Sequence, residues 1–301
     1  MINTLLANPV AFKIGSLEVY WYGIIITAAI LIATIFCMFE CKRHKGSTDY
    51  ILTLFLWVVP LAIVFARLAY VVFHPKDFFP IESWADFKHI WDIREGGISI
   101  LGAIPGGVLG AFINYIITKK SKNATNKMDF RELLDILAPS MILGQALGRW
   151  GNFVNQELYG AEITNPKFQC FPFAVQIDVH PVYENGVFVT NLYDHWFQAT
   201  FFYEMVLNLI GFAIIVIIGR KCKKNLAPLT FYLTWYLAVR SVMESLRTDA
   251  VVSNGIHVGV VGCAIGAAIS FIIFVLILTN VIHTGVPKYI VDSTPIEPDE
   301  E

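Results

Sequence analysis

Four polar residues in an apolar stretch near residue 240 have the spacing of one helix face. Within YLAVRSVMESLRTD, intervals of 4, 4 and 3 residues separate Tyr236, Arg240, Glu244 and Arg247. Side chains at these intervals lie on the same side of an α-helix. Two interpretations are open. Either the arginines and Glu244 form a ladder that locks helix packing, or the stripe lines a site for a lipid headgroup or another anion, for which the planar guanidinium is well suited.

A second polar group occupies another apolar stretch, DILAPSMILGQALGRWGNFVNQELYG. Gln145, Arg149 and Asn152 share a helix face in this stretch, and Arg67 is a third arginine inside an apolar segment. Ionisable residues within membrane spans are energetically expensive and usually functional. These arginines are therefore the first candidates for a functional site.

The composition of the chain and its apolar runs predict the helices that position these residues. The chain has 301 residues, of which 56% are hydrophobic and 15% charged, with a net charge of −2 and a mean hydropathy of +0.60. Soluble domains carry about 25% charged residues. The composition excludes a soluble domain, a disordered chain and a soluble nucleic-acid binder, and it predicts an all-α polytopic membrane protein. A span needs about 20 mostly apolar residues, and seven segments qualify: 20–39, 51–73, 97–118, 132–153, 200–219, 229–246 and 256–282.

The distribution of lysine and arginine predicts the orientation of these spans. With the N-terminus outside, the cytoplasmic loops and tail hold 12 of these residues and the outer segments hold 6. The sequence therefore predicts an outer N-terminus and a cytoplasmic C-terminus. In that orientation Arg67, Arg149 and Arg240 all lie toward the outer leaflet.

Residues 1–282 are predicted to form a single transmembrane domain. An outer arm at about 74–96 contains the Trp and Phe residues typical of a membrane interface. A small outer head at about 154–199 is predicted to contain a β-hairpin, because ENG is a turn sequence between partly alternating residues. Residues 283–301 are predicted to be a disordered cytoplasmic tail.

Packing alone explains several other residues. Gly102, Gly106 and Gly110 recur at every fourth position, which predicts a face for close helix packing. Asp135 is interpreted as a structural partner of Arg131 or of a neighbouring helix. The five cysteines show neither the spacing of metal ligands nor a disulfide framework, so no metal site is predicted.

The block GRWGNFVNQELYG at 148–160 resembles the signature of the prolipoprotein diacylglyceryl transferase family, which is close to G-R-x-G-N-F-x-N-x-E-x-x-G. All fixed positions match: Gly148, Arg149, Gly151, Asn152, Phe153, Asn155, Glu157 and Gly160. Further similarities cover most of the chain: WYG at 21–23, Arg67 with Tyr70, D-x-x-A-P at 135–139, Tyr203 with Glu204, and the stripe from Tyr236 to Arg247.

The resemblance implies an enzyme of the bacterial cell membrane that needs no metal or organic cofactor. Its reaction would transfer the diacylglyceryl group of phosphatidylglycerol to the lipobox cysteine thiol of a preprolipoprotein, forming a thioether. The implied partners are phosphatidylglycerol, the signal peptides of preprolipoproteins and the lipid bilayer, with no nucleic acid. Two alternatives stay open: a transporter or binding protein for an anionic lipid or solute, and an inactive paralogue.

The resemblance also implies the roles of individual residues. Arg149 and Arg240 are expected to bind the phosphate, because fixed guanidiniums stabilise the charge that develops there. Glu157 and Glu244 are expected to hold the guanidiniums, and these four residues form the catalytic set. The remaining substrate-binding residues are expected to be Asn152, Tyr22, Arg67, Tyr236 and Arg247.

Two departures from the family pattern remove imidazoles. The family commonly has His or Tyr where Leu101 stands, and often has His-Pro where Gln198 and Ala199 stand. These departures support the inactive paralogue as an alternative and leave the general base open. The carboxylates that remain as candidates are Glu157, Glu204 and Glu244.

Overall fold

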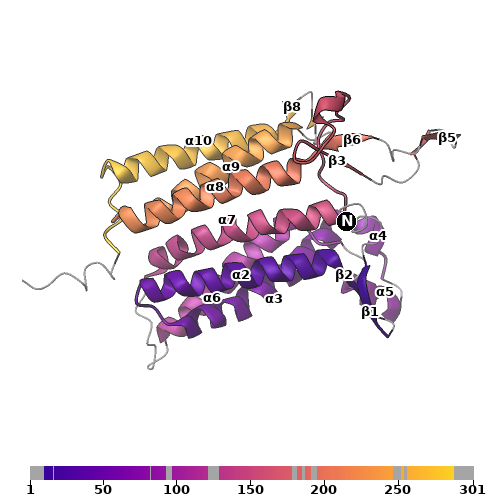
Figure 1. The fold of residues 1–301 in the computed structure, drawn as a ribbon. Helices are drawn as coiled ribbons and strands as arrows, with labels where there is room; N and C mark the ends of the chain where they lie inside the picture. The colour runs from indigo at the N-terminus through magenta and orange to yellow at the C-terminus, as the bar shows by residue number, and fades with distance from the viewer. Residues whose placement is uncertain are drawn as a thin grey trace, which may run out of the picture. The chain divides into compact units, whose positions relative to one another are not determined.

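Seven long helices dominate the part of the chain that the structure describes (Figure 1). The computed structural model describes residues 10–15, 17–81, 83–92, 97–120, 129–177, 182–184, 187–190, 195–246, 252–253 and 256–287. Each predicted span coincides with one long helix, and these helices are α2 (Trp21–Arg43), α3 (Thr48–Phe73), α6 (Ile100–Lys120), α7 (Phe130–Val154), α8 (Thr200–Lys221), α9 (Ala227–Leu246) and α10 (Val258–Leu278).

Five of these helices are long and apolar enough to cross a membrane, namely α2, α3, α6 as far as Thr118, α8 and α10. The other two, α7 and α9, carry the polar residues that the sequence singled out. The protein is therefore a largely helical, multi-pass membrane protein. The seven-span count stays a prediction.

The chain folds into two compact units. One unit contains residues 1–37 and 131–301, and the other contains residues 38–130. The helix α2 contributes to both, since it runs across the boundary at residue 37. The single transmembrane domain at 1–282 stays a prediction, and most of the predicted tail at 283–301 lies outside the described residues.

The 38–130 unit is built on close packing of α3 against α6. A Cβ added at Gly102 would lie 2.1 Å from the backbone oxygen of Phe65, and one added at Gly106 would lie 2.5 Å from that of Leu61. The predicted glycine face is thus confirmed, because backbone fills the space that side chains would need. Two short helices, α4 (Pro75–Phe78) and α5 (Trp84–Ile90), follow α3 in the predicted arm.

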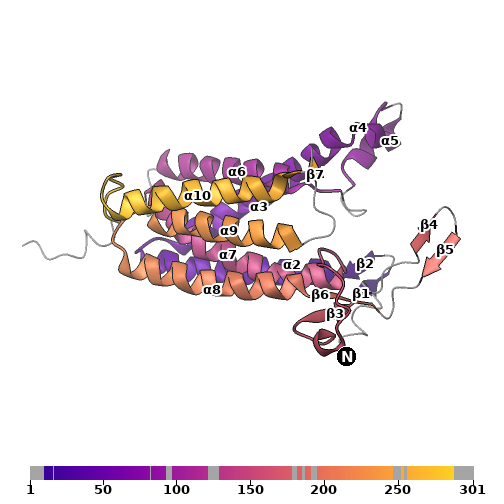
Figure 2. The same ribbon diagram turned by 90° about the horizontal axis from the view of Figure 1, so that it is seen from above.

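In the other unit, α7, α8, α9 and α10 lie side by side (Figures 1 and 2). The indole Nε1 of Trp235 on α9 donates to the Leu207 carbonyl on α8 at 2.9 Å. The carboxylate of Asp135 on α7 accepts from the backbone N–H groups of Leu226 and Leu229, at 2.6 and 3.2 Å. Asp135 therefore holds the start of α9 and is a structural partner of a neighbouring helix, as interpreted from the sequence.

Four small antiparallel strand pairs occur among the described residues. The predicted hairpin around ENG is present as β4 (Val182–Glu184) and β5 (Val187–Thr190). The other pairs are β1 (Val10–Ile14) with β2 (Leu17–Tyr20), β3 (Ala174–Gln176) with β6 (Trp196–Gln198), and β7 (Val252–Ser253) with β8 (Ile256–His257). These pairs and the short 3₁₀ helix η1 (Pro166–Phe168) were not predicted, because segments of two to five residues show too little hydrophobic periodicity.

Candidate active site

Two arginines from separate helices meet at one carboxylate. Glu204 on α8 forms an ion pair with Arg149 of α7, at 2.7 Å between Nη2 and Oε1. Arg240 of α9 lies on the other oxygen of Glu204, at 3.9 Å between Nη1 and Oε2. The Glu204 side chain is only 5% exposed and that of Arg149 only 14%. Low exposure strengthens these attractions, since water screens them little.

The network extends from each arginine. The Arg149 Nη1 donates to the Asn152 side-chain oxygen at 3.1 Å, and the Asn152 amide donates to Glu157 at 2.8 Å. On the other side, Arg240 donates from Nη2 to Glu244 at 2.6 Å. One continuous network therefore joins side chains of α7, α8 and α9 with the turn that follows α7.

Two tyrosines border this network. The ring of Tyr22 on α2 covers Gly151, where an added Cβ would lie 3.0 Å from the ring, and its side chain lies near Glu157 and Arg149. Tyr236 on α9 lies near Arg149, Glu204 and Arg240, and its ring stacks on that of Tyr232 with centroids 5.9 Å apart.

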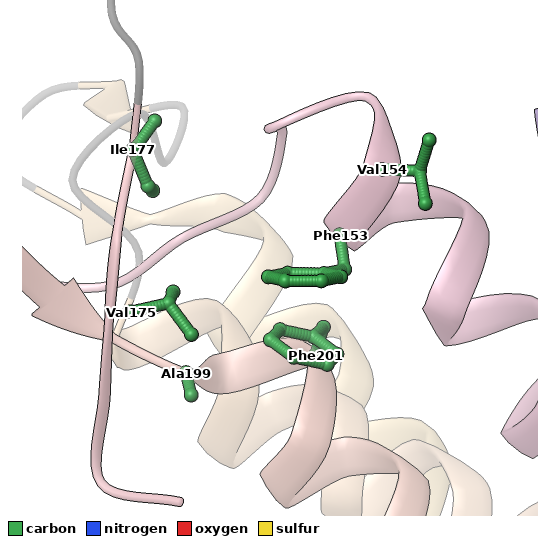
Figure 3. Close-up of a cluster of buried hydrophobic side chains, with 6 residues drawn as sticks. All are labelled: Phe153, Val154, Val175, Ile177, Ala199 and Phe201. Carbon is green, nitrogen blue, oxygen red and sulfur yellow. The ribbon is translucent and has the colours of Figure 1, made fainter. Parts of the chain in front are cut away.

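A buried apolar cluster holds the end of α7 against the start of α8. Figure 3 shows that the rings of Phe153 and Phe201 face one another in this cluster, and their centroids are 4.5 Å apart. Phe153 lies one turn beyond Arg149, and Phe201 lies about one turn before Glu204. This packing therefore fixes the two helices at the level where Arg149 and Glu204 meet.

The turn that carries Glu157 has an unusual backbone. Gln156 and Leu158 both have positive φ, at 53° and 60°, a region that costs energy for residues other than glycine. The turn is held by the Thr200 hydroxyl, which donates to the Leu158 carbonyl. It is also held by Gly160, whose N–H donates to the Gln198 carbonyl at 3.3 Å. The conformation thus aims Glu157 back toward Asn152.

The structure brings together five of the residues that the sequence assigned to the site: Arg149, Arg240, Glu157, Glu244 and Asn152. Tyr22 and Tyr236 lie beside them. Arg247 lies outside the described residues. The functional roles of all these residues stay predictions.

Arg67 is in the other unit and serves its fold. Its guanidinium donates to the carbonyl oxygens of Ile90, His89 and Gly97, at 2.6 to 2.9 Å, and the residue is 3% exposed. It also lies 5.1 Å from the ring centre of Phe78. Arg67 therefore ties α3 to the arm and to the segment before α6.

Glu204 is the residue that the sequence assignment left out of the site. It matched the family pattern and was one of three candidate proton acceptors, but it received no role with the arginines. It is the only acidic residue in α8, a mostly apolar helix, and this isolated charge was the available signal. Its position between two guanidiniums depends on helix packing, which no spacing along one helix reveals.

The arrangement can bind an anion and accept a proton. With Glu204 and Glu244, the two guanidiniums form a group of zero formal charge, which lowers the cost of placing them among apolar helices. The Arg240 side chain is 24% exposed and lies 3.9 Å from Glu204, so part of its guanidinium can reach solvent or an anion. No group of three or more potential metal-ligating His, Cys, Asp or Glu side chains occurs in the described part of the chain.

Comparison with known proteins identifies similar chains. A family model described as prolipoprotein diacylglyceryl transferase matches residues 9–277. The phosphatidylglycerol–prolipoprotein diacylglyceryl transferase of Listeria monocytogenes is 35% identical over 92% of this chain and 89% of its own length. A Clostridium perfringens protein of that name, numbered 1, is 36% identical over 91% of this chain and 95% of its own. The Clostridium botulinum transferase is 35% identical over 87% of this chain and 94% of its own.

Proposed function

Because this chain belongs to the prolipoprotein diacylglyceryl transferase family, we propose that it transfers the diacylglyceryl group of phosphatidylglycerol to the lipobox cysteine of preprolipoproteins. In this reaction the cysteine sulfur attacks the glyceryl carbon of the lipid. A carbon–sulfur bond forms, the bond from that carbon to the phosphate oxygen breaks, and glycerol 1-phosphate leaves. The thiol proton passes to a base.

One observation carries this proposal: two guanidiniums from different helices share the carboxylate of Glu204. Negative charge gathers on the phosphate oxygens as the bond to carbon breaks. Arg149 and Arg240 bind that phosphate in our proposal, and their fixed positions stabilise the transition state without reorganisation. Asn152 and Tyr22 orient the glycerol or the headgroup, while Glu244 and Glu157 keep the donors in place.

The same network activates the thiol. A free cysteine has a pKa of about 8.5, so only a few per cent is thiolate at neutral pH. Guanidiniums nearby favour the anion. A carboxylate of the network then accepts the proton, directly or through water. Leu101 has no proton chemistry, and this route needs no imidazole at that position.

We place the network within a bilayer, with seven spans, an outer N-terminus and a cytoplasmic C-terminus. The polar residues of α7 and α9 suit this placement because they pair with one another and with α8, as ionisable groups in membrane spans usually do. The excess of lysine and arginine in the proposed cytoplasmic loops supports the orientation.

Mass measurement of a lipobox peptide tests the proposal. Purified protein is incubated with phosphatidylglycerol vesicles and the peptide, and a peptide with serine in place of the cysteine is the control. We expect the cysteine peptide alone to gain the mass of one diacylglyceryl group. Binding of the lipid without a covalent product would support a transporter or binding protein instead, and neither binding nor product would support an inactive paralogue.

A further inference from the structure

Within and next to the arginine network, besides the ion-paired Glu204 Oε1, four buried polar atoms of α7 and α8 lack a hydrogen-bond partner in the described part of the chain. They are Arg149 Nε, Gln145 Oε1 and both amide atoms of Asn208. Asn208 is 0% exposed. Burying a polar atom without a hydrogen bond costs free energy, so we expect these atoms to bind a small polar ligand.

The register between α7 and α8 places these residues at the same level. Arg149 of α7 pairs with Glu204 of α8. Ile142, seven residues before Arg149, lies beside Gly211, seven residues after Glu204: a Cβ added at Gly211 would be 2.9 Å from the Cδ1 of Ile142. The two helices therefore run antiparallel. Gln145 lies four residues before Arg149 in α7, and Asn208 lies four residues after Glu204 in α8. Both therefore lie one helical turn from the ion pair, on the side of the α7 N-terminus, and face each other.

The direction of the side chains brings the four atoms closer. Helical side chains lean toward the N-terminus of their helix. By this rule we expect the Arg149 Nε to lie on the side of Gln145, and the Asn208 amide to point toward the turn of Glu204. The Gln145 amide is fixed because its nitrogen donates to the Tyr232 hydroxyl at 3.0 Å, which leaves the amide oxygen for another partner.

We infer that Gln145 and Asn208 bind internal water, which holds the Arg149 guanidinium through its Nε. The four atoms comprise two donors and two acceptors, a set that one or two waters satisfy, since a buried water typically makes about three hydrogen bonds. Ile142 and Trp235, one turn further from the ion pair, belong to a buried hydrophobic cluster. Gln145 and Asn208 are thus positioning residues that act on the phosphate site through Arg149.

Two substitutions of Asn208 separate this role from packing. Asn208→Leu keeps the branched shape but removes both polar atoms, whereas Asn208→Ser keeps a polar group and leaves room for water. We expect Asn208→Leu to lower kcat with phosphatidylglycerol about ten-fold, since Arg149 loses a hydrogen bond, and Asn208→Ser to stay within about three-fold of the parent. A residue that only fills space gives the opposite order, which would overturn the inference.

Ser140→Ala is the matched control. Ser140 is also a buried polar residue of α7, but its hydroxyl donates to the Ile136 carbonyl of its own helix. We expect parental kinetics from this variant. If Asn208→Leu does not survive extraction into detergent, Gln145→Met replaces it, because methionine fills similar space and removes the amide.

X-ray radiolysis in isotopically labelled water detects the bound water directly. Water held beside a buried side chain is activated in place and oxidises that side chain, which mass spectrometry then locates. Tyr232 is 6% exposed, and we expect it to be labelled in the parent and in Asn208→Ser but not in Asn208→Leu. An unlabelled Tyr232 in the parent would overturn the inference.

The kinetic part rests on the proposed transferase function, whereas the labelling does not. A parent protein that makes no thioether product refutes the function, and the labelling of Tyr232 still decides the water site. A parent that is active and labelled, with an Asn208→Leu variant that keeps full kcat, leaves the function intact and refutes the positioning role.

Discussion

At the scale of single residues, the site depends on the different chemistry of arginine and lysine. Arg149 uses one terminal nitrogen for Glu204 and the other for Asn152. A lysine in its place keeps the charge but cannot make both contacts in that planar geometry. We therefore expect Arg149→Lys to lose at least about a hundred-fold in transfer while the protein stays folded in detergent. The peptide assay measures this, with Arg220→Lys at the end of α8 as the control, and near-normal transfer by Arg149→Ala would refute the assignment.

Glu204 supplies the negative charge that two guanidiniums share. Glu204→Gln keeps the shape but leaves Arg149 and Arg240 close together without that charge. Removing one partner of a buried ion pair costs about 3 kcal/mol or more. We expect a clearly lower Tm in detergent together with loss of transfer. Glu162→Gln, at an exposed pair with His195, is the control and should leave the Tm nearly unchanged. An unchanged Tm in Glu204→Gln would show that the arginines do not need this carboxylate.

We expect His44 to make the stability of the 38–130 unit depend on pH. Its Nε2 accepts from Arg43 at 3.0 Å, which requires a neutral imidazole. Burial first, and then the Arg43 charge, lower the pKa of His44 to about 3. In the unfolded chain this pKa is about 6.5, so below that pH the unfolded chain binds a proton that the folded protein does not. The contribution of neutral His44 to the free energy of unfolding is therefore complete above about pH 6.5 and is lost as the pH falls from 6.5 toward 3. We expect the Tm of the parent to fall more between pH 7.5 and pH 5 than that of His44→Gln, and equal falls would contradict this.

At the scale of elements, one helix surface shows how closely α3 and α6 approach. A Cβ at Gly106 would lie 2.5 Å from the Leu61 carbonyl oxygen, whereas a Cβ at the adjacent Gly107 meets nothing nearer than 3.7 Å. We expect Gly106→Ala to lower the Tm in detergent, because the backbone of α3 must move away. Gly107→Ala is the matched control and should be neutral or slightly stabilising, since alanine is the better helix former. Equal effects of the two variants would show that the glycine face does not set the packing.

At the scale of the whole molecule, the proposed orientation makes a prediction for the loop between α6 and α7. The basic residues around position 123 favour the cytoplasm. A cysteine introduced by Asn123→Cys should resist an impermeant thiol reagent in intact cells and react after permeabilisation. Lys167→Cys, in the proposed outer head, is the control and should react in intact cells, with the parent giving the background of the native cysteines. Reaction of position 123 in intact cells would reverse the orientation.

The sequence by itself determined the seven helices, the glycine face, the hairpin at ENG and most members of the arginine network. Each of these is a local pattern: an apolar run of span length, a four-residue interval, a turn sequence or a family signature. Such patterns can be recognised in the sequence alone, because the direction of a side chain within a helix or strand depends only on the backbone period.

Only the tertiary structure decided which of those side chains meet. Arg67 and Arg149 are both arginines within apolar segments, yet one binds backbone carbonyls of its own unit and the other binds Glu204. The register of α7 against α8 places Glu204 next to Arg149 and Asn208 opposite Gln145. That register is set by contacts such as Phe153 with Phe201. The physical reason is that packing between helices depends on shape at every contact along them, which spacing within a single helix does not encode.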